Sequence, residues 1–140
     1  MPYADNEGVR IYYEIEGRDK PALVMAHGGT GRLEDWRKHG YTDAFKDEFQ
    51  LLLYDARMHG RSDRPNVASI SIMADDVIAV LDSAGVAKAN YWGYSMGSAI
   101  GLDLAVRHPS RFGSFAFGGI SPYQWAEAIV KPLKEARKAL

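Results

Sequence analysis

The stretch Gly93-Tyr94-Ser95-Met96-Gly97 decides the fold prediction for this chain. It follows a short apolar segment, residues 89–92, and precedes a run of small and apolar residues with helical spacing, residues 96–107. A strand, a sharp turn and a helix in this order hold the serine on a strained turn, where its hydroxyl stands clear of the backbone. A glycine two residues to either side lets the strand and the helix approach without a clash between Cβ atoms.

Two other loops carry suggestive residues after apolar runs. His27-Gly28-Gly29-Thr30-Gly31 follows residues 22–26, and Asp55-Ala56-Arg57-Met58-His59-Gly60-Arg61-Ser62 follows residues 49–54. Apolar runs without alternation are typical of strands that are buried on both faces of a parallel sheet. Ligands of such sheets bind at the carboxyl ends of the strands, so we expect these two loops and Ser95 to share one rim.

The remaining pattern completes an α/β prediction. Residues 9–15 alternate between apolar and polar side chains, which predicts a half-buried strand, and residues 2–5 before a turn predict an edge strand beside it. A fourth apolar run covers residues 111–117, and helical spacing covers residues 33–45, 71–84 and 96–107. The sequence therefore predicts one domain over residues 1–140, with a mostly parallel sheet and flanking helices.

Composition narrows the function classes. The net charge is −1 and no basic run is present, so nucleic-acid binding is not indicated. The chain has no cysteine, which excludes disulfides, thiolate metal sites and cysteine nucleophiles. No apolar run is long enough to span a membrane and no signal peptide is visible, so we expect a cytoplasmic protein. Residues 27–31 lack the spacing of a dinucleotide fingerprint and of a phosphate-binding loop.

Taken together, these motifs resemble the N-terminal half of an α/β-hydrolase-fold protein, of the esterase, haloperoxidase-like and C–C bond hydrolase branch. The resemblance covers essentially all 140 residues. It is specific for the fold and weak for the substrate. The motifs that carry it are His-Gly-Gly at 27–29, Asp-x-Arg-x-His-Gly-x-Ser at 55–62, the turn at 93–97, the opening at 6–14, and Gly-Gly-Ile-Ser-Pro at 118–122.

The resemblance implies a serine hydrolase that cleaves an ester or related acyl bond in a small molecule, with no metal and no organic cofactor. Ser95 would be the nucleophile of an acyl-enzyme. The backbone N–H of Met96 and that of Gly28 or Gly29 would form the oxyanion hole. The alternatives are a tight-turn serine without chemistry and an ordinary glycine-rich turn.

The resemblance also assigns supporting residues at the rim. Asp55 and Arg57 would brace the loops by hydrogen bonding. Met58 stands where the family often has glycine, a departure that would alter the turn or expose the methionine side chain.

A catalytic base is hard to find in this sequence. In this fold the acid and the histidine follow the serine along the chain, and the only later histidine is His108. The helix that Ser95 begins would carry His108 roughly 20 Å away. His39 is expected at the surface and His59 in the bracing loop. His27 has two interpretations, as a candidate base or as the residue that orients the oxyanion loop. The later acidic residues lie on predicted helices: Asp103, Glu127 and Glu135.

Three hypotheses follow for the missing base. The chain is a hydrolase core truncated before its last strands, with residues 123–140 as the start of a cap or terminal helix. Otherwise it is a non-catalytic module that binds a small ligand. In the third hypothesis, another chain completes the sheet or supplies the base. Because residues 112–117 would form an exposed apolar edge strand, we expect a homo-oligomer or a partner at that edge.

Overall fold

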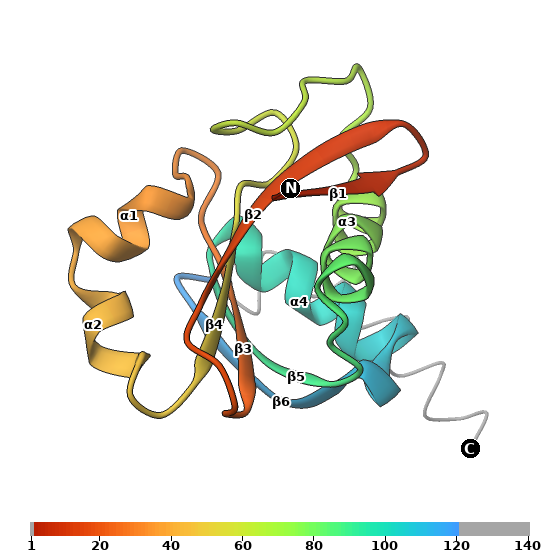
Figure 1. Ribbon diagram of the computed structural model, residues 1–140. Coiled ribbons are helices and arrows are strands. Elements are labelled where there is room, and N and C mark those ends of the chain that lie inside the picture. Colours follow the sequence, from red (N-terminus) through yellow and green to blue (C-terminus); the bar gives the residue numbers. More distant parts are fainter. Residues whose placement is uncertain (1, 121–140) are drawn as a thin grey trace.

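Six strands form one sheet in the computed structural model, which describes residues 2–120 (Figure 1). The spatial order is β1-β2-β4-β3-β5-β6; β1, β2 and β4 pair antiparallel, and β4, β3, β5 and β6 run parallel. The prediction of an α/β fold with a mostly parallel sheet is confirmed. The strands are β1 (Tyr3–Asn6), β2 (Val9–Glu16), β3 (Ala22–Ala26), β4 (Gln50–Tyr54), β5 (Ala89–Tyr94) and β6 (Phe112–Gly118).

The helices correct one prediction. The segment predicted as a single helix over residues 33–45 forms two short helices, because Gly40 adopts a left-handed φ of 81° between them. The predicted terminal helix within residues 123–140 lies outside the described residues. The helices are α1 (Leu33–Lys38), α2 (Tyr41–Phe45), α3 (Ile70–Ala84) and α4 (Met96–Arg107), followed by a 3-10 turn (Pro109–Arg111).

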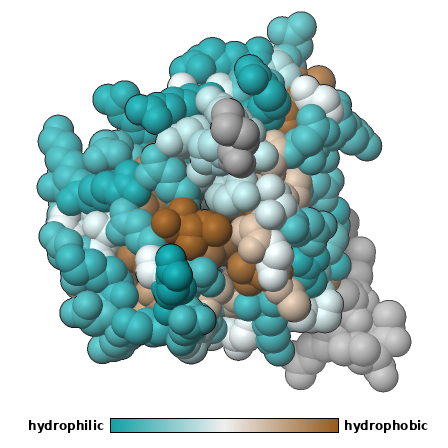
Figure 2. Space-filling view, in the orientation of Figure 1, coloured by the Kyte–Doolittle hydropathy of each residue, from teal (hydrophilic) through white to brown (hydrophobic). Residues whose placement is uncertain are grey.

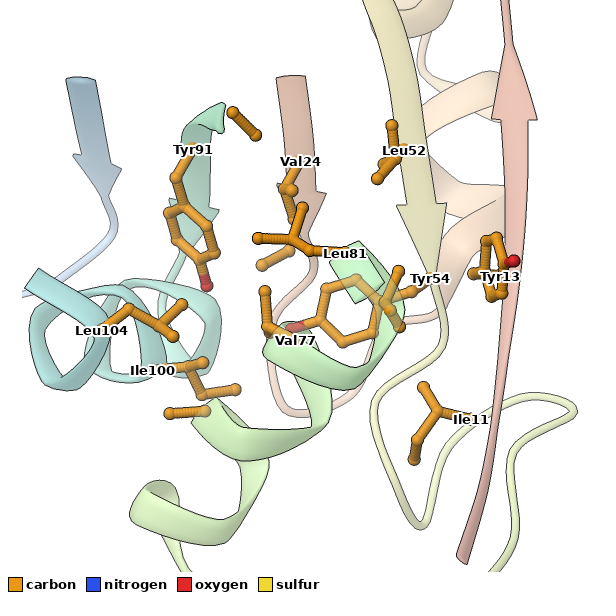
Figure 3. Packing of buried hydrophobic residues seen from close by; sticks show 14 of the residues in the cluster. Ile11, Tyr13, Val24, Leu52, Tyr54, Val77, Leu81, Tyr91, Ile100 and Leu104 are labelled. Atoms are coloured by element: carbon orange, nitrogen blue, oxygen red, sulfur yellow. The ribbon is translucent and has the colours of Figure 1, made fainter. Parts of the chain in front are cut away.

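Helices cover both faces of the sheet. On one face α3 and α4 pack over the strands, and α1 and α2 lie on the opposite side (Figure 1). Figure 3 shows the core under α3 and α4, where Val77, Leu81 and Leu104 lie against Val24 and Tyr91 of the strands. The surface in Figure 2 is mostly hydrophilic, with a small hydrophobic area near the centre of that view. None of the helices within residues 2–120 is long and apolar enough to cross a membrane.

Strand order brings the three predicted loops together. β3 lies between β4 and β5, with Met25 opposite Leu53 and Ala26 opposite Gly93. Because these three strands are parallel, their carboxyl ends meet at one edge of the sheet. The residues that follow them, His27, Asp55 and Ser95, therefore share one rim.

Candidate active site

Ser95 lies on a strained turn between β5 and α4. Its backbone has φ 52° and ψ −112°, a conformation that L-residues adopt rarely. A Cβ on Gly93 would lie 2.4 Å from the carbonyl oxygen of Gly97, and a Cβ on Gly97 would lie 2.1 Å from that of Ala26. Both distances are shorter than any tolerated contact, so this turn requires glycine at both positions.

The strained turn is tied to the end of β6. The N–H of Ser95 donates to the carbonyl oxygen of Gly118 at 2.8 Å. The fully buried Ser98 hydroxyl lies 2.9 Å from the Gly93 oxygen and 2.8 Å from the Gly118 oxygen, and it accepts the Gly118 N–H at 3.1 Å. Ser98 is not among the site residues predicted from the sequence. The signal that could have found it is a hydroxyl on the buried side of the helix, among small apolar residues.

The loop after β3 packs against the turn that carries Ser95. A Cβ on Gly28 would lie 3.1 Å from the ring of Tyr94 and 3.5 Å from the Cβ of Ser95, so only glycine leaves room between them. A Cβ on Gly29 would meet nothing within 4 Å. Within residues 2–120, the backbone N–H groups of Gly28, Gly29 and Met96 donate to no protein acceptor. Unpaired N–H groups near a serine hydroxyl are what an oxyanion hole needs.

His27 holds the glycine loop through both ring nitrogens. Nδ1 lies 2.7 Å from the Gly28 carbonyl oxygen, and Nε2 lies 3.0 Å from the backbone nitrogen of Ala56. Nδ1–H therefore donates and Nε2 accepts, which is the neutral form of the ring. Burial lowers the pKa of His27, with the neighbouring His59 acting in the same direction and the Gly28 carbonyl opposing. Neither nitrogen is free for Ser95, so this geometry fits the loop-orienting interpretation and not the base.

Asp55 joins the start of α1 to the loop after β4. One carboxylate oxygen accepts the N–H of Leu33 at 2.7 Å, and the other accepts the N–H of Arg61 at 2.9 Å. A Cβ on Gly60 would lie 2.2 Å from this carboxylate. These contacts suit the bracing role that the sequence suggested for Asp55.

Arg57 forms a buried ion pair with Asp76 of α3. Two guanidinium nitrogens of Arg57 lie 2.6 and 2.7 Å from the two carboxylate oxygens of Asp76, and both side chains are almost fully buried. A third contact of 2.8 Å reaches the carbonyl oxygen of Val67. Met58, next along the chain, has φ 71° and an exposed side chain, so the departure from the family glycine costs backbone strain and exposes methionine.

The remaining histidines lie at helix ends or in the bracing loop. His39 follows α1, and His108 follows α4 with its Nε2 3.7 Å from the carboxylate of Asp75. His59 contacts two backbone carbonyls of the rim. Among residues 2–120, no group of three or more histidine, aspartate or glutamate side chains is placed to hold a metal ion.

A cavity of about 610 Å³ borders the glycine loop. Aromatic side chains form much of its wall, and Trp36, Tyr41 and Trp92 contact one another with ring centroids 4.9 to 5.4 Å apart. Its rim includes Gly28 and Tyr94, the residues beside Ser95. The cavity therefore offers a space with a partly aromatic and partly polar wall next to the candidate oxyanion hole.

Known proteins are similar to this chain in sequence and in fold. A family model described as the alpha/beta hydrolase fold matches residues 21–135. A putative carbamate hydrolase, RutD, of Azorhizobium caulinodans is 36% identical over 141 aligned positions, covering 100% of this chain and 51% of that protein. The 3-oxoadipate enol-lactonase 2 of Acinetobacter baylyi is 33% identical over 76% of this chain and 40% of its own length.

Solved structures of hydrolases are also similar to this chain. The enol-lactonase from Burkholderia xenovorans LB400 has a TM-score of 0.77 and 32% identity, over 93% of this chain and 53% of the other. Est816, described as an N-acyl homoserine lactone degrading enzyme, has a TM-score of 0.78 and 33% identity over 89% and 51%. The chain thus spans about half the length of the relatives that it matches. The family model, the relatives, the sheet and the strained serine turn agree. The chain therefore belongs to the alpha/beta hydrolase fold family.

Proposed function

We propose that this chain carries the nucleophile and the oxyanion hole of a serine hydrolase that acts on an ester or related acyl bond. The observation that carries the proposal is the backbone of Ser95, held at φ 52° with Gly28 packed against it, while the N–H groups of Gly28, Gly29 and Met96 have no protein acceptor within residues 2–120. A backbone conformation of such high free energy persists only where the surrounding structure enforces it, and strained residues of this kind are concentrated at functional sites.

The reaction would proceed through an acyl-enzyme. Ser95 Oγ attacks the substrate carbonyl carbon and gives its proton to a base, and the carbonyl oxygen becomes an oxyanion held by the N–H groups. The bond to the leaving alcohol breaks as that alcohol takes up the proton. Water then attacks the acyl-enzyme, releases the acid and restores the serine hydroxyl.

The names of the relatives narrow the substrate class. Two are named as lactonases and one as a putative carbamate hydrolase, so their named substrates carry a carbonyl bonded to oxygen or nitrogen. We extend this to a small ester, lactone or carbamate for the present chain. The cavity beside Gly28 and Tyr94 would receive the acyl part, because its aromatic side chains Trp36, Tyr41 and Trp92 favour an apolar group.

The base of this proposal would not be His27, His59 or His108. The sequence contains four histidines, and all of them lie within the described part. His27 and His59 use both ring nitrogens on backbone groups. His39 follows α1 and lines the same cavity as Tyr94. His108 ends the helix that Ser95 begins, roughly 20 Å away.

Acylation by p-nitrophenyl acetate tests the proposal. We expect intact-protein mass spectrometry to find one added acetyl group, peptide mapping to locate it on Ser95, and the Ser95→Ala variant to lack it. Acetylation of lysines only, at equal rates in both proteins, would count against Ser95 as a nucleophile.

A second candidate role is an assembly in which another chain completes the site, as a homo-oligomer or with a different partner. The observation that favours it is β6, which pairs only with β5 among the described strands and leaves Phe117 37% exposed. An apolar edge with unpaired backbone groups recruits further strands. Sedimentation over a range of concentrations tests this role: we expect association, and a monomer at every concentration would oppose it.

A further inference from the structure

Two carbonyl oxygens face His59, one at each ring nitrogen. Nδ1 lies 2.8 Å from the oxygen of Arg57, and Nε2 lies 2.6 Å from the oxygen of Gly29. A carbonyl oxygen only accepts hydrogen bonds, and a neutral imidazole has a single N–H to donate. Both contacts are satisfied together only when both ring nitrogens carry a proton.

His27 has the opposite surroundings although its ring centroid is only 5.1 Å from that of His59. Its nitrogens face one acceptor, the Gly28 oxygen, and one donor, the Ala56 N–H. This set suits a neutral ring. A neutral His27 also removes the repulsion that a second charge would exert on a protonated His59 at this distance.

The two rings together fix the orientation of the glycine loop. In a trans peptide the C=O of one residue points opposite to the N–H of the next. The Gly28 oxygen is held by His27 and by the N–H of Gly31, at 3.0 Å, and the Gly29 oxygen is held by His59. The N–H groups of Gly29 and Thr30 therefore point away from these rings, and within residues 2–120 neither donates to a protein acceptor.

Packing does not fix the Gly29 peptide. Gly29 has no side chain, and even a Cβ there would meet no atom within 4 Å. Glycine is also the residue with the most conformational freedom. Within residues 2–120, this peptide is restrained by the turn that the Gly31 N–H closes on the Gly28 oxygen and by the hydrogen bond from His59 to its own carbonyl.

We propose that His59 is a positioning residue for the glycine loop: as an imidazolium it bridges the Arg57 and Gly29 carbonyls, fixes the Gly29–Thr30 peptide, and keeps the Thr30 N–H available to a substrate carbonyl beside the N–H groups of Gly28 and Gly29. The proposal rests on the proposed function of Ser95. His59 would touch no reacting atom, and would act only through the loop.

Two measurements test it, and the first does not depend on Ser95 chemistry. Nitrogen-15 spectra of the histidine rings at neutral pH report the protonation of each nitrogen directly, with the His59 signals assigned from their loss in His59→Phe. We expect both His59 nitrogens to carry protons and the His27 ring to be neutral. We also expect His59→Phe to shift the amide signals of Gly29 and Thr30.

The second measurement is the rate at which a fluorophosphonate labels Ser95. Loss of an oxyanion donor slows acyl transfer by about 10²- to 10³-fold, so a donor left unfixed should cost about tenfold in His59→Phe. His59→Gln, which keeps one N–H donor, should recover part of the rate. His108→Gln makes the same chemical change at the far end of α4 and should label at the wild-type rate.

The outcomes separate the two proposals. A His59 ring with one proton, or a His59→Phe variant that labels at the wild-type rate with unshifted Gly29 and Thr30 amides, overturns the positioning role. If Ser95 in the wild type is not labelled, the proposed function fails. The ring and amide spectra then still decide whether His59 orients the loop.

Discussion

The side-chain hydroxyl of Ser98 lies 2.8 Å from the carbonyl oxygen of Gly118, so the first turn of α4 is fastened to the end of β6. The same carbonyl accepts the N–H of Ser95. A single peptide at the end of β6 therefore supports both the backbone of the candidate nucleophile and the helix behind it. The strain at Ser95 is held by these contacts and by the close approach of Gly93 and Gly97.

Ser98→Ala should destabilise the fold by about 1–3 kcal/mol, because it leaves the partly buried Gly118 N–H without its acceptor. Urea unfolding followed by circular dichroism measures this. Ser114→Ala is the matched control, since Ser114 lies on β6, the strand of Gly118, with an exposed hydroxyl that donates to the Asn90 side chain, and it should change stability by less than about 0.5 kcal/mol. Equal effects of the two variants would mean that the Ser98 contacts add nothing specific.

The strain at Ser95 predicts an unusual order of stability. Glycine tolerates positive φ and alanine does not, so Ser95→Gly should be more stable than Ser95→Ala by about 1 kcal/mol. Both variants lack the hydroxyl, so the comparison isolates the backbone. If Ser95→Ala is the more stable of the two in urea unfolding, the turn is not strained as described.

Met58 offers a second test of backbone strain, away from the candidate nucleophile. Its φ is 71° and its side chain is 41% exposed, so Met58→Gly loses little packing and relieves a left-handed conformation that costs about 1–2 kcal/mol. The greater freedom of glycine in the unfolded chain offsets part of this gain, which leaves a net stabilisation of about 0.5 kcal/mol.

Thermal unfolding of Met58→Gly and Met58→Ala separates strain from side-chain loss. The alanine variant keeps the strain and should match the wild type, whereas the glycine variant should unfold at a higher temperature. A glycine variant that unfolds below the alanine variant would contradict this account of residue 58.

His27 makes the free energy of unfolding depend on pH in the acid range. Burial lowers its pKa below the ordinary value of about 6.5, so between the two values the unfolded chain binds a proton that the folded chain does not. Stability should fall as the pH drops below about 6.5, by up to about 1.4 kcal/mol per pH unit from this group, until the folded pKa is reached.

Urea unfolding at a series of pH values measures that slope. His27→Gln removes the titrating group and should respond less steeply to acid over the same range. A variant with the slope of the wild type would show that His27 is not the group that the folded chain keeps neutral.

Much of the fold could be predicted because the relevant signals are local. The uninterrupted apolar run of β3 and the alternation of residues 9–15 correspond to the strands observed. The break between α1 and α2 was missed, because a glycine within a helical pattern does not say whether it will adopt positive φ. Gly40 does so after His39, where the first helix ends.

The contacts of the site could not be read in the same way, because they depend on strand order. β3 lies between β4 and β5, which brings the His27 ring to the backbone of Ala56 and leaves it without a free nitrogen. The contact between His59 and Gly29 joins loops that are 30 residues apart in sequence. The serine turn was predictable because the pentapeptide itself encodes it, with glycines that the structure shows to be sterically required.

We propose that the fold prepares Ser95 for acyl transfer even though His27 and His59 have no free ring nitrogen to act as its base. The most direct measurement is the rate of Ser95 phosphonylation by a fluorophosphonate, in the native chain, in the urea-unfolded chain and in Ser95→Ala, with and without added imidazole as an external base. In triad enzymes the oxyanion hole and substrate binding together retain about 10³- to 10⁴-fold catalysis, so the native chain should label at Ser95 faster than the unfolded chain. Imidazole should raise that rate further, and Ser95→Ala should show neither effect. Labelling that is equal in the native and unfolded chains, or spread over other residues, would contradict the claim.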